Sequence, residues 1–302
     1  MVENLGMGPL SVEIDVALVK RLLAEQVPEW ADLPLAPVAS AGTDNALFRL
    51  GGDRVVRLPR VNWAAGQATK EHAWLPRLAP ALPMALPVPL FLGVPGEGYP
   101  WNWTVCRWLE GRDGVAAAIT DQTHAATTLA GLIRALQGID TTDGPLSGRI
   151  NNYRGVALAR LDTVVREALS KLTGEIDVAA AATVWEVALA APVWDRPGVW
   201  LHGDLHPGNL LVAEGRLSAV IDFGLLAVGD PACDLMVAWS VLDHGSRPLF
   251  RAGLTIDNAT WTRGRGWALY VSSIALAHYL TSDPTLAAIS RRTLGQVLAD
   301  QA

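Results

Sequence analysis

Two short segments of the chain hold most of the side chains that could perform chemistry. The first, Leu201–Asn209, reads LHGDLHPGN, and the second, Ile221–Gly224, reads IDFG. Together they supply a carboxylate at Asp204, a carboxamide five residues later at Asn209, and a second carboxylate thirteen residues further on at Asp222. Asp and Asn oxygens are hard ligands that suit Mg²⁺, and a further carboxylate can orient a hydroxyl group and accept its proton.

This set of groups fits phosphoryl transfer. That reaction needs oxygen ligands for a metal that bridges the phosphates, and an acceptor hydroxyl held in line near a base. The spacing H-x-D-x-x-x-x-N followed by D-F-G is the kinase pattern, with Gly203 where Arg is usual. Six fixed identities coincide by chance on the order of 10⁻⁸ per start position. We therefore predict a kinase with Asp204 as the catalytic base and with Asn209 and Asp222 as Mg²⁺ ligands.

The first hundred residues predict a small antiparallel sheet with two helices. Turn signals such as Gly51-Gly52-Asp53 separate the apolar runs. Strands are expected at Leu35–Ser40, Ala46–Leu50, Arg54–Leu58, Leu90–Val94 and Trp101–Trp108, and helices at Val12–Gln26, with Ser11 as N-cap, and Asn62–Leu78.

The remainder is dominated by Ala- and Leu-rich helical patterns. Helices are expected at Asp121–Gly138, Arg154–Leu172, Asp177–Ala191, Pro231–Leu242, Gly266–Leu280 and Pro284–Leu298, and short strands at Val199–His202, Leu210–Val212 and Leu217–Ile221. The last two strands form a hairpin that would return Asp222 to the side of Asn209. We predict an α+β, bilobal fold: a small antiparallel-sheet N-lobe (1–107) that binds nucleotide, and a larger, mainly helical C-lobe (108–302) that carries the catalytic loop and the acceptor site.

Three segments together resemble a known family. They are His202–Asn209, Asp222–Gly224 and Gly229–Leu235, and the resemblance extends from about Pro37 to Trp239. They resemble the aminoglycoside phosphotransferase family, which has the protein-kinase-like fold, includes macrolide phosphotransferases, and has choline and homoserine kinases as relatives. The resemblance implies ATP or GTP between the lobes, Mg²⁺ as cofactor, and the three site residues in the roles given above.

The same resemblance implies how the N-lobe holds the phosphates. The segment Ser40–Asn45 is similar to the family's shortened nucleotide loop, so Ser40 and Gly42 are expected there. Arg57 lies on the third strand, where kinases place the lysine that grips the α- and β-phosphates. An Arg keeps the charge and can clamp phosphates at two points. Glu71, on the following helix, is its expected ion-pair partner.

The resemblance also assigns supporting residues. The backbone from Cys106 to Trp108 is expected to face the adenine as an inter-lobe hinge. His202 is expected to pack beneath the metal-binding turn, His206 to line the acceptor site, and Asp230 to brace a loop.

Composition limits the partners. The 302 residues are 50% hydrophobic and carry a formal net charge of -6, which does not suit a nucleic-acid partner. No secretory signal or membrane-spanning stretch is predicted. The two cysteines, Cys106 and Cys233, lack metal-type spacing and are expected to be reduced. We expect a cytoplasmic monomer or homodimer whose partner is a small molecule.

The resemblance favours an aminoglycoside-like antibiotic as the acceptor. Its ammonium groups would need carboxylates, for which the C-terminal part offers Glu110, Asp113, Asp195, Asp243 and Asp257. The alternative, a macrolide 2'-phosphotransferase, would need an apolar wall, which could come from Trp194, Trp239, Trp261 and Trp267. A metabolic kinase for homoserine, choline or a sugar is the other alternative.

Two further classes are weighed against the kinase. The string His202 to His206, H-x-D-x-H, could belong to a metal-dependent hydrolase. A non-catalytic pseudokinase would explain Arg57 in place of Lys, but it would not need all three catalytic-site residues. Neither a P-loop nor a G-x-S-x-G elbow occurs.

Overall fold

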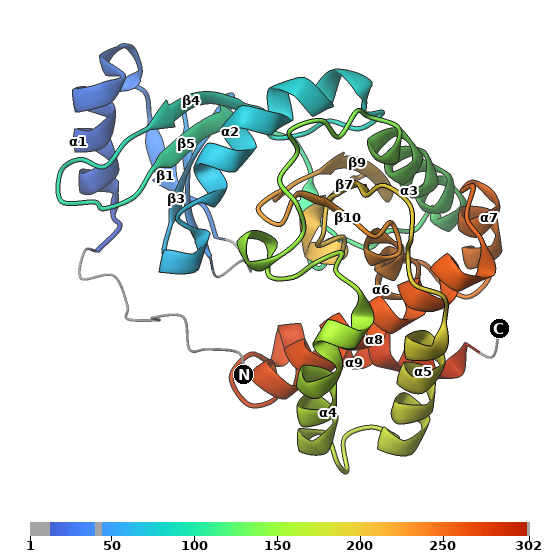
Figure 1. The fold of residues 1–302 in the computed structure, drawn as a ribbon. Helices are drawn as coiled ribbons and strands as arrows, with labels where there is room; N and C mark the ends of the chain where they lie inside the picture. Colours follow the sequence, from blue (N-terminus) through green and yellow to red (C-terminus); the bar gives the residue numbers. More distant parts are fainter. Residues whose placement is uncertain (1–12, 40–43, 301–302) are drawn as a thin grey trace.

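The structure, a computed structural model, describes residues 13–39 and 44–300 and divides into a smaller and a larger lobe (Figure 1). The smaller lobe is built on an antiparallel sheet with the strand order β1-β2-β3-β5-β4. Its strands are β1 (Leu35–Pro37), β2 (Asn45–Leu50), β3 (Arg54–Pro59), β4 (Pro89–Gly93) and β5 (Trp103–Arg107). The α+β, kinase-like fold class predicted from the sequence is confirmed.

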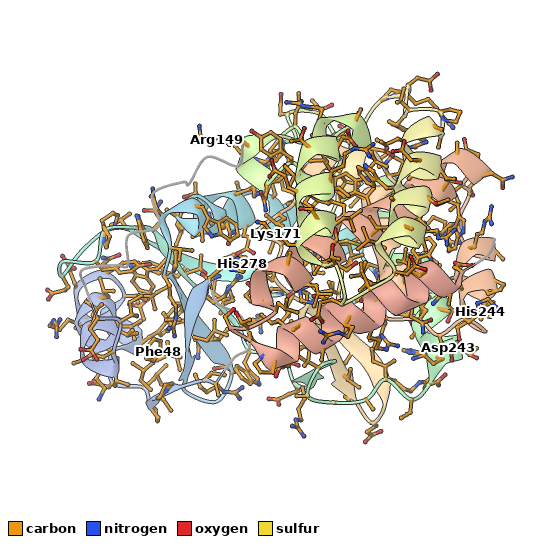
Figure 2. The ribbon with its side chains drawn as sticks, turned by 90° about the horizontal axis from the view of Figure 1, so that it is seen from below. Phe48, Arg149, Lys171, Asp243, His244 and His278 are labelled. Atoms are coloured by element: carbon orange, nitrogen blue, oxygen red, sulfur yellow. The ribbon has the colours of Figure 1, made fainter. Side chains whose placement is uncertain are left out.

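Alternation along β2 and β3 gives this sheet two different faces. Phe48 pairs with Val56 and is buried in the N-lobe core, whereas Leu47 pairs with Arg57 on the opposite face. Figure 2 shows Phe48 within the smaller lobe, on the side of helix α1 (Val16–Gln26). Side chains alternate between the two faces along a strand, so the register of β2 against β3 decides which face each of these residues occupies.

Helix α1 begins later than the sequence predicted. Asp15 is its N-cap and accepts a 2.7 Å hydrogen bond from the Leu18 N–H, so the helix starts at Val16 and not at Val12. A capping Asp satisfies free N–H groups of the first turn. The expected cap Ser11 lies outside the described residues.

Helix α2 (Gln67–Leu78) links the two lobes. It contacts β4 and β5 on one side, yet its Leu75 and Leu78 belong to the core of the larger lobe. Trp74 adds a ring contact to Trp200, with centroids 4.8 Å apart. The division of the chain at residue 107 stays a prediction, and α2 ties the N-terminal part firmly to the larger lobe.

The larger lobe combines seven α-helices with two small sheets among its described residues. The helices are α3 (Gln122–Gln137), α4 (Asp162–Lys171), α5 (Val178–Ala190), α6 (Val237–Ser240), α7 (Arg247–Ala252), α8 (Asn258–Tyr279) and α9 (Pro284–Ala299). The sheets are β6-β8-β9 (Arg112–Asp113, Leu210–Ala213, Arg216–Val220) and β7-β10 (Val199–Leu201, Ala227–Gly229). The described residues of both lobes also form short 3₁₀ turns: η1 (Pro28–Trp30), η2 (Asn62–Ala64), η3 (Ala79–Ala81), η4 (Arg149–Asn151), η5 (Leu158–Leu161), η6 (Pro207–Asn209) and η7 (Cys233–Met236).

Several predicted boundaries in this lobe were wrong. Arg154 is not the start of a helix but lies in a loop, because Asn152 and Tyr153 adopt left-handed φ angles of 51° and 59°. Helix α8 starts at Asn258, well before the predicted Gly266, behind an Asp257 N-cap. The predicted helix over 231–242 is split into η7 and α6, and β6, β10 and α7 were not predicted.

Among the residues that the structure describes, no helix combines the length and the apolar character needed to cross a bilayer.

Candidate active site

A cleft of about 760 Å³ opens between the two lobes. The N-lobe sheet contributes residues of β2 and β3, and the larger lobe contributes the loop after β7 and residues of α8 and α9. The lining on the N-lobe side includes Val38, Asp44, Asn45, Leu47, Val55 and Arg57. The loop after β7 adds Asp204, His206 and Asn209, and the segment after β9 adds Asp222. All three residues predicted to carry the chemistry therefore line one cleft.

The loop after β7 is fixed by backbone contacts. Gly203 has a φ of +85°, and a Cβ at this position would lie 2.7 Å from the Leu225 carbonyl oxygen, so only glycine fits without strain. The Asp234 carboxylate accepts 2.8 Å hydrogen bonds from the N–H groups of His202 and Gly203. The backbone conformation at 203 therefore suits Gly better than the Arg that is usual in the kinase pattern. The two hydrogen bonds to Asp234 hold the backbone next to Asp204 in place.

Asp204 and Asn209 are joined directly. The Asn209 Nδ2 donates to the Asp204 carbonyl oxygen at 2.9 Å and to the Asp204 Oδ2 at 3.2 Å. With both contacts made by its nitrogen, the amide oxygen of Asn209 accepts no hydrogen bond from any described residue. Asn209 is almost fully buried, and its amide oxygen is therefore held in place as a candidate metal ligand.

Asp222 is brought beside Asn209 by the β8–β9 hairpin, as the sequence predicted. The Ile221 N–H donates to the Asn209 carbonyl oxygen at 2.9 Å. Asp222 then takes a φ of +61°, a left-handed conformation that Asp adopts more readily than most residues. Its Oδ1 accepts from the Gly224 N–H at 3.3 Å, and its Oδ2 accepts no hydrogen bond from the described part of the chain.

The donor set fits Mg²⁺. Asn209 and Asp222 each present one oxygen without a hydrogen bond, and Mg²⁺ is commonly held by one or two protein oxygens together with phosphate oxygens and water. Within residues 13–39 and 44–300, no three His, Cys, Asp or Glu side chains gather as a metal cage. The two free oxygens therefore suit a metal that arrives with a nucleotide better than a permanently caged ion.

The histidines of the H-x-D-x-H string do not converge on a metal position. His202 is fully buried, and its ring bonds to the Ile221 carbonyl oxygen at 3.0 Å and to the Asp204 N–H at 3.2 Å. The His206 Nδ1 accepts from the Gly208 N–H at 3.1 Å. These contacts disfavour the hydrolase alternative.

Arg57 and Glu71 meet as expected. The Arg57 Nη1 donates to the Glu71 Oε2 at 2.8 Å, and its Nη2 reaches the Asp222 Oδ1 at 3.5 Å. Burial by itself would lower the pKa of Arg57, but the carboxylates of Glu71 and Asp222 outweigh it and the net shift is upward. Arg57 thus stays charged and connects the N-lobe sheet to the candidate metal ligand.

Arg154 and His206 flank the Asp204 carboxylate. The Arg154 Nη2 lies 3.4 Å from its Oδ1 and the His206 Nε2 lies 3.6 Å from its Oδ2. Burial would raise the pKa of Asp204, but His206 and Arg154 outweigh burial and hold it well below its usual range. Burial likewise acts to lower the pKa of His206, and Asp204 reverses that shift to a rise. Asp204 is therefore ionised at neutral pH.

The inter-lobe hinge differs in part from expectation. Arg107, Trp108 and Leu109 line the cleft, but the Trp108 N–H already donates to the Asp53 carbonyl oxygen at 2.8 Å. Cys106 is fully buried, pairs with Val55 in the sheet and does not line the cleft. The backbone N–H of Trp108 is therefore not free to meet a base.

Three other expected site residues fall outside the cleft or outside the described chain. Ser40 and Gly42 lie outside the described residues. Asp230 is buried, binds the Arg263 guanidinium through both oxygens at 2.8 and 3.0 Å, and accepts from the Ala232 N–H at 2.9 Å. These contacts suit a brace between α8 and the segment after β10.

The end of the cleft that the larger lobe forms is largely apolar. Helices α8 and α9 form its wall, with Tyr270, Val271, Ile274, Ala275, His278, Tyr279, Leu286 and Ile289 among the lining residues. The sequence did not predict this wall, because it arises where two helices of separate segments meet. The Trp residues proposed for it lie elsewhere: Trp239, Trp261 and Trp267 are buried in the core, and Trp194 lines a separate pocket.

The candidate carboxylates do not converge on the cleft. Asp113 lines it, but Asp257 lines the separate pocket and pairs with Arg196. Figure 2 shows Asp243 at the end of the larger lobe away from the N-lobe. Glu110 and Asp195 are exposed and do not line the cleft.

Comparisons with known proteins agree with this geometry. A family model described as the phosphotransferase enzyme family, APH, matches residues 36–267. The chain belongs to this family. As a family member it is a phosphotransferase, the enzyme class that the sequence predicted.

Solved structures give the same fold for this phosphotransferase. The GDP and kanamycin complex of APH(2")-IIIa is 19% identical with a TM-score of 0.71, covering 94% of this chain and 99% of that one. Macrolide 2'-phosphotransferase MphH from Brachybacterium faecium is 22% identical with a TM-score of 0.60, covering 93% and 97%. The streptomycin-ATP-APH(2")-IIa ternary complex is 19% identical with a TM-score of 0.60, covering 90% and 93%. No curated protein sequence matches the chain significantly.

Proposed function

We propose that this phosphotransferase is a small-molecule kinase that moves the γ-phosphate of ATP or GTP, with Mg²⁺, onto a hydroxyl group. The observation that carries the proposal is the meeting of three side chains in one cleft. Asn209 bonds to Asp204 at 3.2 Å, and Asp222 follows a residue that bonds to the Asn209 backbone at 2.9 Å. A carboxylate beside two hard oxygen ligands is the arrangement that phosphoryl transfer needs.

In this proposal the N-lobe, residues 1–107, holds the donor nucleotide and the larger lobe, residues 108–302, holds the acceptor. Arg57, fixed by Glu71, would bind the nucleotide phosphates. Asn209 and Asp222 would hold Mg²⁺, which neutralises charge on the phosphates when bound. Solved relatives in complex with GDP and with ATP support either nucleotide as the donor.

Asp204 would orient the acceptor hydroxyl and take its proton. The hydroxyl oxygen forms the new bond to phosphorus, the bond from phosphorus to the bridging β–γ oxygen breaks, and the nucleoside diphosphate leaves. The low pKa of Asp204 makes it a weak base. That suits a loose transition state, in which the hydroxyl needs to be aligned more than deprotonated.

An antibiotic is the acceptor class that the family relationship supports most. Relatives bind kanamycin or are macrolide phosphotransferases. The apolar wall of α8 and α9 and the scattered carboxylates favour the macrolide-like alternative over an aminoglycoside. A nucleotide donor and two unpaired thiols, Cys106 and Cys233, fit a reducing cytoplasm.

A panel of hydroxyl compounds tests this function. The protein is incubated with Mg²⁺, either ATP or GTP, and an aminoglycoside, a macrolide, homoserine, choline or a sugar. Mass spectrometry is expected to find one product that is heavier by one phosphate, and the Asp204→Asn variant should form it at least about 10²-fold more slowly. If the rate of nucleotide hydrolysis does not change with any of the added hydroxyl compounds and no phosphorylated product forms, the result would count against a small-molecule kinase.

A further inference from the structure

Arg154 is a buried cation at the larger-lobe end of the cleft, and the proposed mechanism gives it no contact with the acceptor. The left-handed residues Asn152 and Tyr153 precede it, and the buried Asn151 holds its carbonyl oxygen through a 2.8 Å hydrogen bond. Its side chain lines the cleft, although only 8% of the residue is exposed. The loop therefore presents one fixed guanidinium to the space beside Asp204.

This guanidinium is poorly satisfied by the protein. Its five N–H groups make one hydrogen bond to the described residues. This bond is long, because Nη2 lies 3.4 Å from the Asp204 Oδ1. Its Nε is buried and has no partner in the described part of the chain. Tyr270 holds the guanidinium in position, 5.5 Å from the ring centroid. Buried charges are normally paired at short range, so Arg154 retains capacity for an oxygen ligand.

The wall next to Arg154 offers no competing charge. The cleft-lining residues of α8 and α9 include no Asp, Glu, Lys or Arg: Ala268, Tyr270, Val271, Ser272, Ile274, Ala275, His278, Tyr279, Leu286, Ile289, Ser290 and Thr293. A molecule with an apolar body could rest on this wall and turn an oxygen towards Arg154. A polyammonium compound would meet a cation there and no carboxylate on the wall.

We propose that Arg154 selects the acceptor. It binds a carboxylate or carbonyl oxygen close to the hydroxyl that Asp204 orients, and it repels compounds with several ammonium groups. A planar guanidinium is suited to such oxygens because its N–H groups point in parallel. The inference rests on the proposed function, since it assumes that this end of the cleft holds the acceptor.

Three probes with one apolar body test the selection: 4-phenylbutyrate, 4-phenylbutyramide and 4-phenylbutylamine. Each is titrated into the full-length protein saturated with Mg²⁺ and ADP. The carboxylate is expected to bind more tightly than the ammonium by roughly 10- to 100-fold, with the amide between them, since hydrogen bonds to charged groups have about this effect. The Arg154→Gln variant should lose most of the difference, whereas Arg154→Lys should keep the order.

Arg160→Gln is the matched control, because Arg160 is exposed and contacts a tyrosine ring, that of Tyr153, outside the proposed site. Equal binding of the acid and the amine by the wild-type protein, or no binding of either, would overturn the proposal. So would an Arg154→Gln variant that loses turnover but keeps the acid preference, which would assign Arg154 to the transferred phosphoryl group. Absence of Mg²⁺-dependent ADP binding would instead defeat the proposed function, and the inference with it.

Discussion

At the scale of single residues, Asp204 is held by a guanidinium, an imidazole and an amide. Arg154 approaches the Oδ1 of Asp204 and His206 approaches the Oδ2. The Asn209 Nδ2 also donates to the Oδ2. These contacts fix the rotamer and keep the carboxylate ionised, at the cost of basicity. Asp204 is therefore better suited to aligning a hydroxyl than to removing its proton early.

Replacement of Asp204 by Asn should separate catalysis from nucleotide binding. We expect turnover to fall by about 10²- to 10⁴-fold, the usual contribution of a positioned base. The nucleotide dissociation constant should change little, because Arg57 and the metal ligands remain. Steady-state kinetics and calorimetry check both quantities, with Asp195→Asn, an exposed carboxylate outside the cleft, as control. Turnover close to that of the wild type would refute the role of Asp204.

The pair Arg57–Glu71 should contribute to folding and to binding in separable ways. Arg57→Met leaves the buried Glu71 without its partner, so the free energy of unfolding should fall by about 3–5 kcal/mol. Arg57→Met combined with Glu71→Leu should recover much of that stability but not the nucleotide affinity. Urea unfolding and nucleotide titration measure the two effects. Full nucleotide affinity in the double variant would show that Arg57 does not bind phosphate.

At the scale of elements, helix α2 carries residues that both lobes need. Its Glu71 pairs with the N-lobe sheet, while its Trp74 contacts Trp200 in the larger lobe. On the same helix, the Lys70 Nζ donates to the Ile150 carbonyl oxygen at 3.4 Å. The helix therefore couples the position of Arg57, the proposed phosphate ligand, to the larger lobe.

Lys70 should make the stability of the protein depend on pH. Burial lowers its pKa to about 8, against the attraction of Glu71 and Asp222. Between pH 8 and about 10.4 the unfolded chain then holds the extra proton, so the free energy of unfolding should rise with pH in this window. Relative to Lys70→Met, the wild type should gain on the order of 1–3 kcal/mol between pH 7 and 9.5.

Urea unfolding of both proteins at the two pH values measures this gain, because Lys70 is the only titratable group that differs between them. Lys171→Met is the control, since Lys171 is an exposed residue at the end of α4 (Figure 2). A difference between the wild type and Lys70→Met that stays constant with pH would contradict the assignment.

The sequence predicted those elements whose placement depends on local chain geometry. The β8–β9 hairpin joins Asn209 to Asp222 over a short turn, so the spacing in the sequence was enough to bring the ligands together. Arg154 was assigned to a helix because an Ala- and Leu-rich pattern follows it, and nothing in the pattern reveals left-handed residues at 152 and 153. The apolar wall was missed because it depends on how α8 packs against α9.

At the scale of the whole molecule, the site exists only where the lobes meet. The N-lobe core and the larger core are separate clusters, and the cleft draws its polar groups from the surfaces between them. Arg57 comes from one lobe and Asp222 from the other, and they approach to 3.5 Å. A nucleotide with its metal would therefore bridge the two lobes and stabilise their present arrangement.

The most direct measurement of the central claim is a calorimetric titration of the full-length protein with a non-hydrolysable ATP analogue. It is performed with excess Mg²⁺ and again with excess EDTA, for the wild type and for Asp222→Asn. We predict that the wild type binds the analogue at least about tenfold more tightly with Mg²⁺, and that Asp222→Asn loses most of this gain. Binding that is equally tight in EDTA, or a gain unchanged in Asp222→Asn, would contradict a metal held by Asn209 and Asp222.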